Sequence, residues 1–453
     1  MATEQSTTEA DSTETDRAFV PFIGRFFPES LALSVLLAFA AMLVTIPYLE
    51  PLEQLELFTT GFYDLFVLQM ALILYWVLSA TVVEAKPVGA LFDRIADVIP
   101  TNQTAIIYAT GVVALAFGWV NWALGLLGGV YVGRKLCRQA RNEGVSVHYP
   151  LVLTAGLLSL VLANQGPSSP GALLMADGEL AEMTGFLADA GALGMSEFLL
   201  APANLLSSVV LIATLPLLLV ALAPDAEADR TEIRNGSLLD ETIAETFEHY
   251  TRPSEGEWTA ADYLEQSRTI SMIAVIIGFG SIGLYFATGG TLTLFWLLFS
   301  LMILGLLVHV RPMAFRSKTT DATRWANHVA IPFMLYAVVF ALLAEAGLYE
   351  TIGTLLEASA VGPFVAALGI GLLVPDPASV WVIVGPALVA AEADLLPSIV
   401  AVMYGAGLSN LWLGFLFLGI LSIDGFDWQE FLRYAAMVSL YVVVVVVVSI
   451  TVL

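Results

Sequence analysis

The chain has 453 residues, of which 58% are hydrophobic and only 13% are charged. Soluble domains are roughly 45–50% apolar and about 25% charged, so this composition excludes an ordinary soluble protein and indicates many membrane spans. The formal net charge is −24, which leaves no basic face and excludes nucleic-acid binding. The single cysteine, Cys137, cannot form a disulfide within one chain.

The acidic residues are spread over every loop, and lysine occurs only at Lys86, Lys135 and Lys318. Such a surface stays hydrated in a high-salt cytoplasm, so we interpret it as a halophilic and archaeal signature. A local acidic patch that attracts cations is the alternative. Residues 1–20 are expected to be a disordered acidic tail, because no basic segment precedes an apolar core as in a signal peptide.

A spanning helix needs ~20 mostly apolar residues, and the chain contains roughly ten such stretches. In chain order they fall at 31–48, 58–83, 104–133, 149–176, 201–223, 270–288, 292–309, 326–346, 361–390, 397–423 and 434–453. We therefore expect an all-α polytopic membrane protein with about nine full spans and two re-entrant helical hairpins. An acidic cytoplasmic linker, 224–268, separates a first membrane half, 21–223, from a second, 269–453.

Two of these stretches are long enough to enter the membrane and return. Segment 104–133 offers a break at 118–121, and segment 361–390 offers one at 375–377. Basic residues mark the cytoplasmic side of a membrane protein. With both segments as hairpins and the N-terminus cytoplasmic, all 17 Lys and Arg residues face the cytoplasm. The hairpin assignment and the charge rule thus depend on each other.

The two halves share a pattern at a constant separation. Tyr75 and Glu84 correspond to Tyr336 and Glu345, 261 positions later (336 − 75 and 345 − 84). An amphipathic stretch, a hairpin and a long helix with a break follow in each half, the last breaks being 164–170 and 409–410. The copies run in opposite directions, so we expect an inverted repeat whose broken helices surround a central site. The alternative is that Gly and Pro only kink helices for packing.

The helix breaks offer a way to bind an anion without a buried Lys or Arg. A half-helix N-terminus carries roughly half a positive charge, and its N–H groups bind carboxylates. Ser168 and Ser169 precede one such half-helix, and Ser379 precedes another. We expect these serines to bind substrate, with plain N-capping as the alternative.

Amide side chains mark the same breaks. An unbonded amide at membrane depth costs free energy, so each needs a partner or a ligand. We expect a substrate site lined by these amides and the adjacent serine: Gln69, Asn121, Asn164, Gln165, Ser409 and Asn410. Interhelical hydrogen bonding is the alternative for each amide.

Asp376 is the only acid at an expected hairpin tip. A carboxylate there could couple transport to protons or sodium, and a Pro-Asp-Pro turn is the alternative. His328 is interpreted as a satisfied polar contact. No metal, cofactor or enzyme motif is expected, because the G-x-G-x-x-G match at 278–283 lies inside an apolar helix with no preceding strand.

From about residue 22 onward, scattered motifs resemble the short-chain fatty acid transporter family, the acetoacetate and butyrate permeases. The matching stretches are Gln69-Met70-Ala71-Leu72-Ile73, Asn121-Trp122, Tyr149-Pro150-Leu151, Trp381-Val382-Ile383 and Tyr404-Gly405. Trp122 lies in one of them and joins the expected substrate site. The resemblance extends to a superfamily of elevator-type carriers, which implies a homodimer in the bilayer, a small organic anion as substrate and alternating access by a sliding domain.

The chain departs from this family at the tips. The family's second tip resembles Pro-Ser-Gly-Gly-Gly-His-Trp, whereas the sequence here is Pro375-Asp376-Pro377-Ala378-Ser379-Val380-Trp381. The glycines that let backbone approach an anion are missing. These departures put the substrate and the coupling ion in doubt, but not the fold.

We expect a secondary active transporter that moves short-chain fatty acids or similar small monocarboxylates across the cytoplasmic membrane, coupled to protons or sodium. The alternatives are a passive facilitator or channel, which needs a continuous polar pore, and a carrier altered for a different small organic anion. An intramembrane enzyme would need paired catalytic groups at the midplane, and the sequence offers none.

Overall fold

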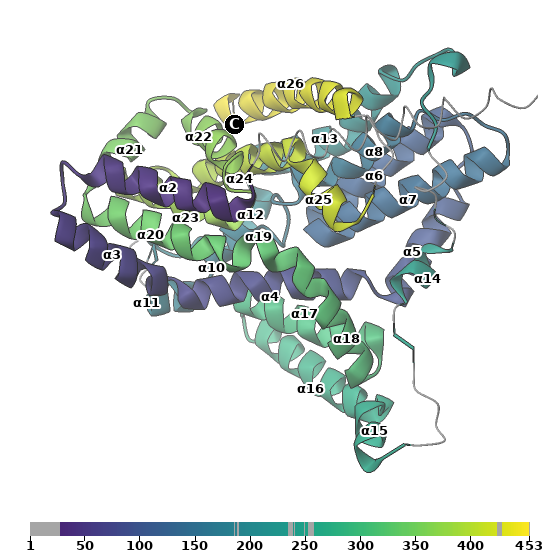
Figure 1. Ribbon diagram of the computed structural model, residues 1–453, viewed down its shortest axis with the longest axis horizontal. Helices are drawn as coiled ribbons and strands as arrows, with labels where there is room; N and C mark the ends of the chain where they lie inside the picture. Colours follow the sequence, from purple (N-terminus) through teal and green to yellow (C-terminus); the bar gives the residue numbers. More distant parts are fainter. Residues whose placement is uncertain are drawn as a thin grey trace, which may run out of the picture.

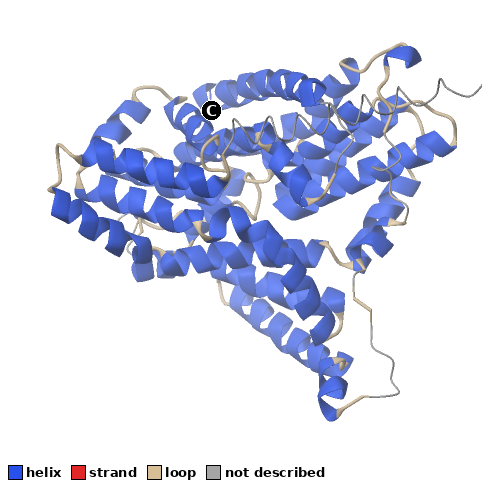
Figure 2. Cartoon of the chain, in the orientation of Figure 1, coloured by secondary structure: helices blue, strands red, loops and turns tan. Residues whose placement is uncertain are grey.

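The computed structural model describes residues 28–452 except 185, 188–189, 234–238, 240, 249, 252–257 and 424–427. Helices make up the regular structure of these residues, and no strand is present among them (Figure 2). Seven helices in the described chain are long and apolar enough to cross a membrane, or up to eight if one bent pair counts as a span. The all-α, multi-pass class is confirmed. The expected tail, residues 1–20, lies outside the described residues.

One side of the body consists of helices from both halves of the chain (Figure 1). The first half contributes α2 (Ser30–Thr45), α3 (Pro51–Asp64) and α4 (Phe66–Val83). The second contributes α16 (Arg268–Ala287), α17 (Leu294–His309), α18 (Pro312–Ala322), η5 (Thr323–Ala326), α19 (Asn327–Ala330) and α20 (Pro332–Glu345). Helix α3 begins before the second expected apolar segment, 58–83, and takes up its first residues, because a Glu50–Glu53 capping box and Pro51 start a separate helix there.

The contacts between these two groups run antiparallel. Glu84 bonds Arg324, the Trp76 ring packs on His328, and Gly61 faces Ala341. Going from Glu84 back to Gly61, the residue contacted in the second half therefore has an increasing number. Midway, the Gln69 amide donates to the carbonyl of Ala330, which lies 261 positions further along the chain. The repeat separation is also 261, so Gln69 meets its own counterpart. This is the contact expected on the two-fold axis of an inverted repeat.

The first expected hairpin is formed by α6 (Gln103–Val120) and α7 (Trp122–Asn142), which follow α5 (Lys86–Asp97). The chain reverses at Asn121. A Cβ added to Gly125 would lie 2.2 Å from the Cα of Gly118, and one added to Gly129 would lie 2.7 Å from the Cβ of Ala114. The two arms therefore pack at a distance that only glycine allows.

The helix after the first hairpin is interrupted. Its first arm comprises α8 (Tyr149–Leu157) and α9 (Ser159–Leu162), and its second arm is α10 (Pro170–Ala176). The side chain of Asn204 donates to the backbone carbonyls of Gln165 and Phe198, each at 3.0 Å. Asn204 thereby anchors the break, residues 163–169, to the start of α13. The remaining helices of this half are α11 (Gly178–Thr184), α12 (Met195–Leu200) and α13 (Pro202–Ala221).

The second half ends in α21 (Leu348–Glu357), α22 (Gly362–Gly371), α23 (Pro377–Ala390), α24 (Leu395–Trp412), α25 (Gly414–Ile420) and α26 (Trp428–Val452). Helices α22 and α23 form the second expected hairpin, and residues 372–376 are its tip. The expected helix break at 409–410 is wrong, because α24 continues through Ser409 and Asn410. The Ser409 hydroxyl bonds the carbonyl of Ala406 at 2.8 Å, which satisfies it inside the helix, and the interruption comes at Leu413.

The polar segment between the halves docks against the first hairpin. It contains η2 (Glu227–Asp229), α14 (Ile243–Phe247) and α15 (Ala260–Glu265). The Asp93 carboxylate on α5 accepts 3.0 Å hydrogen bonds from the backbone N–H groups of Ile243 and Ala244 at the start of α14. Lys135 on α7 pairs with the same carboxylate at 3.0 Å. Figure 1 shows α14 lying beside α5.

Candidate functional site

Three side chains within about one turn of α4 each contact a different interruption of the chain. The Tyr75 hydroxyl donates to the Ser168 carbonyl in the break before α10 at 2.9 Å. The Trp76 indole donates to Asp376 at the tip of the second hairpin at 3.1 Å. Ser79 accepts a 3.1 Å hydrogen bond from Asn121, where the first hairpin turns. Helix α4 therefore holds all three interruptions at one place.

The two hairpin tips are built alike. Asn121 is the N-cap of α7, and its side-chain oxygen accepts from the N–H groups of Ala123 and Leu124. Asp376 is the N-cap of α23, and one of its oxygens accepts from the Ser379 N–H at 2.7 Å. Each cap satisfies helix N–H groups at one end and contacts α4 at the other. The positive ends of both half-helices are thus directed to the same region.

Aromatic rings fill the space between the tips. The Trp76 ring lies 4.2 Å from the Trp122 ring and 4.4 Å from the His328 ring, between centroids. Phe417 on α25 stacks on the same indole with its centroid 6.4 Å away. The contacts bring together side chains from α4, α7, α19 and α25, and they give the region an apolar wall.

Several buried polar atoms in and beside these interruptions have no hydrogen-bond partner among the described residues. Within the described part of the chain they include Trp122 Nε1, Asn164 Nδ2, both polar atoms of Gln165, Ser168 Oγ, His328 Nε2 and Tyr336 OH. Leaving a buried polar group unpaired costs about 1–3 kcal/mol, so such atoms are kept only where something else pairs with them. Most of these atoms can donate to an anion.

The expected site residues fall into two groups. Trp122, Asn164, Gln165 and Ser168 contribute free polar atoms to the region just described. The other expected side chains, Asn410 apart, make hydrogen bonds within the protein: Gln69, Asn121, Ser169, Ser379 and Ser409. Asn410 is buried in α24, the helix before the one that carries Phe417.

Four residues of the site were not singled out as site residues by the sequence: Tyr75, Trp76, Ser79 and Tyr336. The repeat itself carried a signal for two of them, because Tyr75 and Tyr336 occupy equivalent positions in the two halves. Trp76 and Ser79 gave no signal, since both lie in an apolar helix where such residues are common. His328, interpreted as a satisfied contact, does bond the backbone of Trp325, and only its Nε2 atom has no partner among the described residues.

A buried ion cluster lies at the far end of α4. Glu84 accepts hydrogen bonds from Lys318 at 2.8 Å and from Arg324 and the Trp325 indole at 2.9 Å each. The Trp325 ring also contacts the Trp122 ring, with centroids 5.3 Å apart. The cluster therefore joins the central site through one aromatic ring. No group of three or more potential metal ligands occurs among the described residues.

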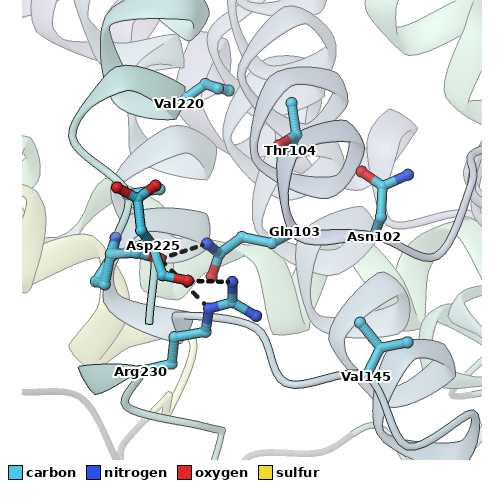
Figure 3. Close-up of a pocket in the computed structure, with 9 residues that line it drawn as sticks. Asn102, Gln103, Thr104, Val145, Val220, Asp225 and Arg230 are labelled. Carbon is cyan, nitrogen blue, oxygen red and sulfur yellow. Dashed lines mark hydrogen bonds between the residues drawn. The ribbon is translucent and has the colours of Figure 1, made fainter. Parts of the chain in front are cut away.

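A separate pocket opens where α13 meets the polar segment (Figure 3). Figure 3 shows the Gln103 and Arg230 side chains converging beside Asp225. Both side chains donate to the carbonyl of Pro224, and Arg230 also donates to that of Asp225. These polar groups bond one another, so the pocket holds the polar segment in place and contributes nothing to the central site.

The fold and the site define a multi-pass membrane protein built on an inverted repeat, in which hairpin tips and a broken helix meet at a buried polar centre. A family model described as "Short chain fatty acid transporter" matches residues 13–453. A short-chain fatty acid transporter of Escherichia coli K12, named so provisionally, is 25% identical over 96% of this chain and 98% of its own. One of Haemophilus influenzae, named in the same way, is 23% identical over 92% and 94%. The chain belongs to the short-chain fatty acid transporter family.

Proposed function

We propose that this protein is a secondary active transporter that binds short-chain fatty acids or similar small monocarboxylates at the site on α4. It carries them across the cytoplasmic membrane with its N-terminus in the cytoplasm, as an elevator-type homodimer driven by a proton or sodium gradient. The observation that carries the proposal is the group of buried, unpartnered polar atoms where both hairpin tips and the broken helix meet.

The chemistry of the site suits a small carboxylate with a short alkyl chain. Asn164, Gln165 and Ser168 offer donors for the carboxylate, and the N-terminus of α7, capped by the neutral Asn121, adds partial positive charge. The rings of Trp76, Trp122 and Phe417 offer an apolar surface for the alkyl chain. Deep burial of the donors favours a carrier over an open pore, because a pore would hydrate them.

Gln165 provides the sharpest test. Both polar atoms of its side chain are buried and have no partner in the part of the chain that the structure describes, whereas its backbone carbonyl is held by Asn204. Gln165→Leu therefore removes substrate contacts without breaking a hydrogen bond. We expect this variant to fold with unchanged or higher thermal stability, because two unpaired polar atoms are removed. Loss of one hydrogen bond to a charged group weakens binding by about 1.5–3 kcal/mol, roughly 10- to 100-fold in KM.

The measurement is uptake of labelled butyrate and acetoacetate into proteoliposomes in high salt, with the rate in protein-free vesicles subtracted. The matched control is Gln139→Leu on α7, whose side chain lies at the surface and bonds Asp97. Folded wild-type protein that moves neither acid under any ion gradient would contradict the function. A Gln165→Leu variant with the wild-type KM would show that the substrate binds elsewhere.

A further inference from the structure

His328 occupies an unusual position for a histidine in a membrane protein. It lies in α19, the single turn between η5 and α20 close to the two-fold axis of the repeat. Its ring stands edge-on to Trp76, at 4.4 Å between centroids, and 6.3 Å from Phe417. Its Nε2 atom is buried, and it has no hydrogen-bond partner among the described residues. A titratable nitrogen with a free lone pair therefore lies in the wall of the proposed substrate site.

Asp376, the other ionisable group of this centre, is already fully engaged. Its Oδ1 accepts from Trp76 Nε1 at 3.1 Å, and its Oδ2 accepts from the Ser379 N–H at 2.7 Å and the Ser379 hydroxyl at 2.6 Å. Three donors point at this carboxylate, so both of its oxygens already act as acceptors. Asp376 is therefore committed to capping α23 and to holding the tip against α4. A proton taken up there would disrupt the tip.

The surroundings of His328 contain few other charges. From α23, Asp376 faces it across the Trp76 ring; from α4 and α25, the facing groups are Trp76 and Phe417. From α20, the nearest titratable group is Tyr336, which also senses Asp376. From η5, Arg324 is turned to Glu84, and with Lys318 it forms the ion cluster behind Trp325. Of these charged groups, Asp376 is the one that a single aromatic ring separates from His328.

We infer that His328 carries the proton in a proton-coupled transport cycle, with Asp376 as its fixed counter-charge. The inference rests on the proposed function and names its coupling ion. As the acid enters, its carboxyl proton passes to the lone pair of Nε2, and the resulting imidazolium N–H donates to the substrate carboxylate. On release the proton returns to the carboxylate oxygen, or both leave separately as proton and carboxylate.

Comparing the charge of the empty centre with that of the loaded centre gives this cycle a specific signature. The empty centre holds neutral His328 and the Asp376 carboxylate, so its charge is that of one carboxylate. The loaded centre holds the imidazolium, the Asp376 carboxylate and the substrate carboxylate, and its charge is the same. Loaded and empty carriers cross the membrane with equal charge, so the net movement is one neutral acid. Transport should respond to a pH gradient and ignore the membrane potential.

The test compares two assays in proteoliposomes that contain wild-type protein or His328→Gln. The first is initial net uptake of labelled acetoacetate driven by a pH gradient, with the membrane potential clamped and the rate in protein-free vesicles subtracted. The second is exchange of labelled for unlabelled acetoacetate at equal pH, which needs no net proton movement. The control is His309→Gln on α17, whose ring bonds the Thr81 carbonyl at 2.8 Å, outside the site.

A gradient of one pH unit supplies about 1.4 kcal/mol, enough to drive up to roughly tenfold accumulation, so it should stimulate net uptake by wild type and the control. We expect His328→Gln to lose this stimulation and to retain measurable but slower exchange, since a neutral amide can still donate to a carboxylate but more weakly than an imidazolium. Stimulation by sodium alone, stimulation of His328→Gln, or loss of exchange together with stimulation in the folded variant would overturn the inference. No transport by wild type in either assay would instead refute the proposed function.

Discussion

His148 shows how the chain treats a histidine that serves structure alone. Its Nδ1 accepts from the Thr231 N–H at 3.1 Å, and its Nε2 pairs with the Tyr434 hydroxyl at 3.0 Å. The ring therefore ties the polar segment and α26 to the start of α8. Both nitrogens have partners, whereas His328 leaves Nε2 free. That difference, and not burial, separates a packing histidine from one available for proton transfer.

The same contacts make stability depend on pH. Burial, together with the nearby Arg230 charge, lowers the pKa of His148 from 6.5 to about 4. The unfolded chain therefore binds more protons than the folded one between these values, and stability falls as the pH drops from about 6.5 towards 4. We expect a loss of about 1–3 kcal/mol across this window, seen as a falling melting temperature in neutral detergent.

The variant His148→Gln isolates this effect, because glutamine can bond but cannot take up a proton. Its melting temperature should change less with pH between 6.5 and 4 than that of wild type. Equal slopes for the two proteins would show that other groups cause the pH dependence.

At the level of elements, the first hairpin and the broken helix meet at several glycines, and the tightest of these contacts is at Gly166. A Cβ added to Gly166 would lie 1.6 Å from the carbonyl oxygen of Trp119, a backbone atom that cannot turn away. Gly166→Ala should push α6 and the break apart, at a cost of about 1–3 kcal/mol from overpacking. We expect a lower melting temperature and a strong loss of uptake.

Gly280→Ala is the matched control for this substitution. Gly280 lies in α16, where an added Cβ meets nothing within 4 Å. In a helix interior alanine is favoured over glycine by up to about 1 kcal/mol, so this variant should be as stable as wild type or more so. A Gly166→Ala protein with normal uptake would show that the close contact is not needed for function.

Sequence patterns predicted the helices and hairpins better than they predicted the contacts between side chains. Both hairpins were predicted because Asn121 and Pro375-Asp376-Pro377 interrupt apolar stretches, and α7 and α23 begin there. The break at 409–410 was wrong because Ser and Asn do not stop a helix when their groups are satisfied within it. The contacts of Tyr75, Trp76 and Ser79 could not be predicted, because which face of an apolar helix meets a distant hairpin tip is decided by tertiary packing.

At the level of the whole molecule, the repeat explains why the site lies where it does. The Gln69–Ala330 contact places the axis between α4 and the start of α20, and the Trp76, His328 and Asp376 cluster is two turns away along α4. Equivalent positions make different contacts, however. Tyr75 bonds Ser168, whereas the hydroxyl of its counterpart Tyr336 has no partner within the described residues. The symmetry determines where the site lies, and the differences between the two halves determine which polar groups are available there.

The charge of the whole molecule leads to a prediction about salt. Acidic residues outnumber basic ones by 41 to 17, so the folded surface repels itself. Screening shortens the reach of this repulsion from about 10 Å at 0.1 M salt to about 3 Å at 1 M. We expect the melting temperature in neutral detergent to rise by several degrees between these KCl concentrations. Sucrose at equal osmolality, which screens no charge, should raise it less; equal effects of the two solutes would contradict a halophilic origin of the acidic surface.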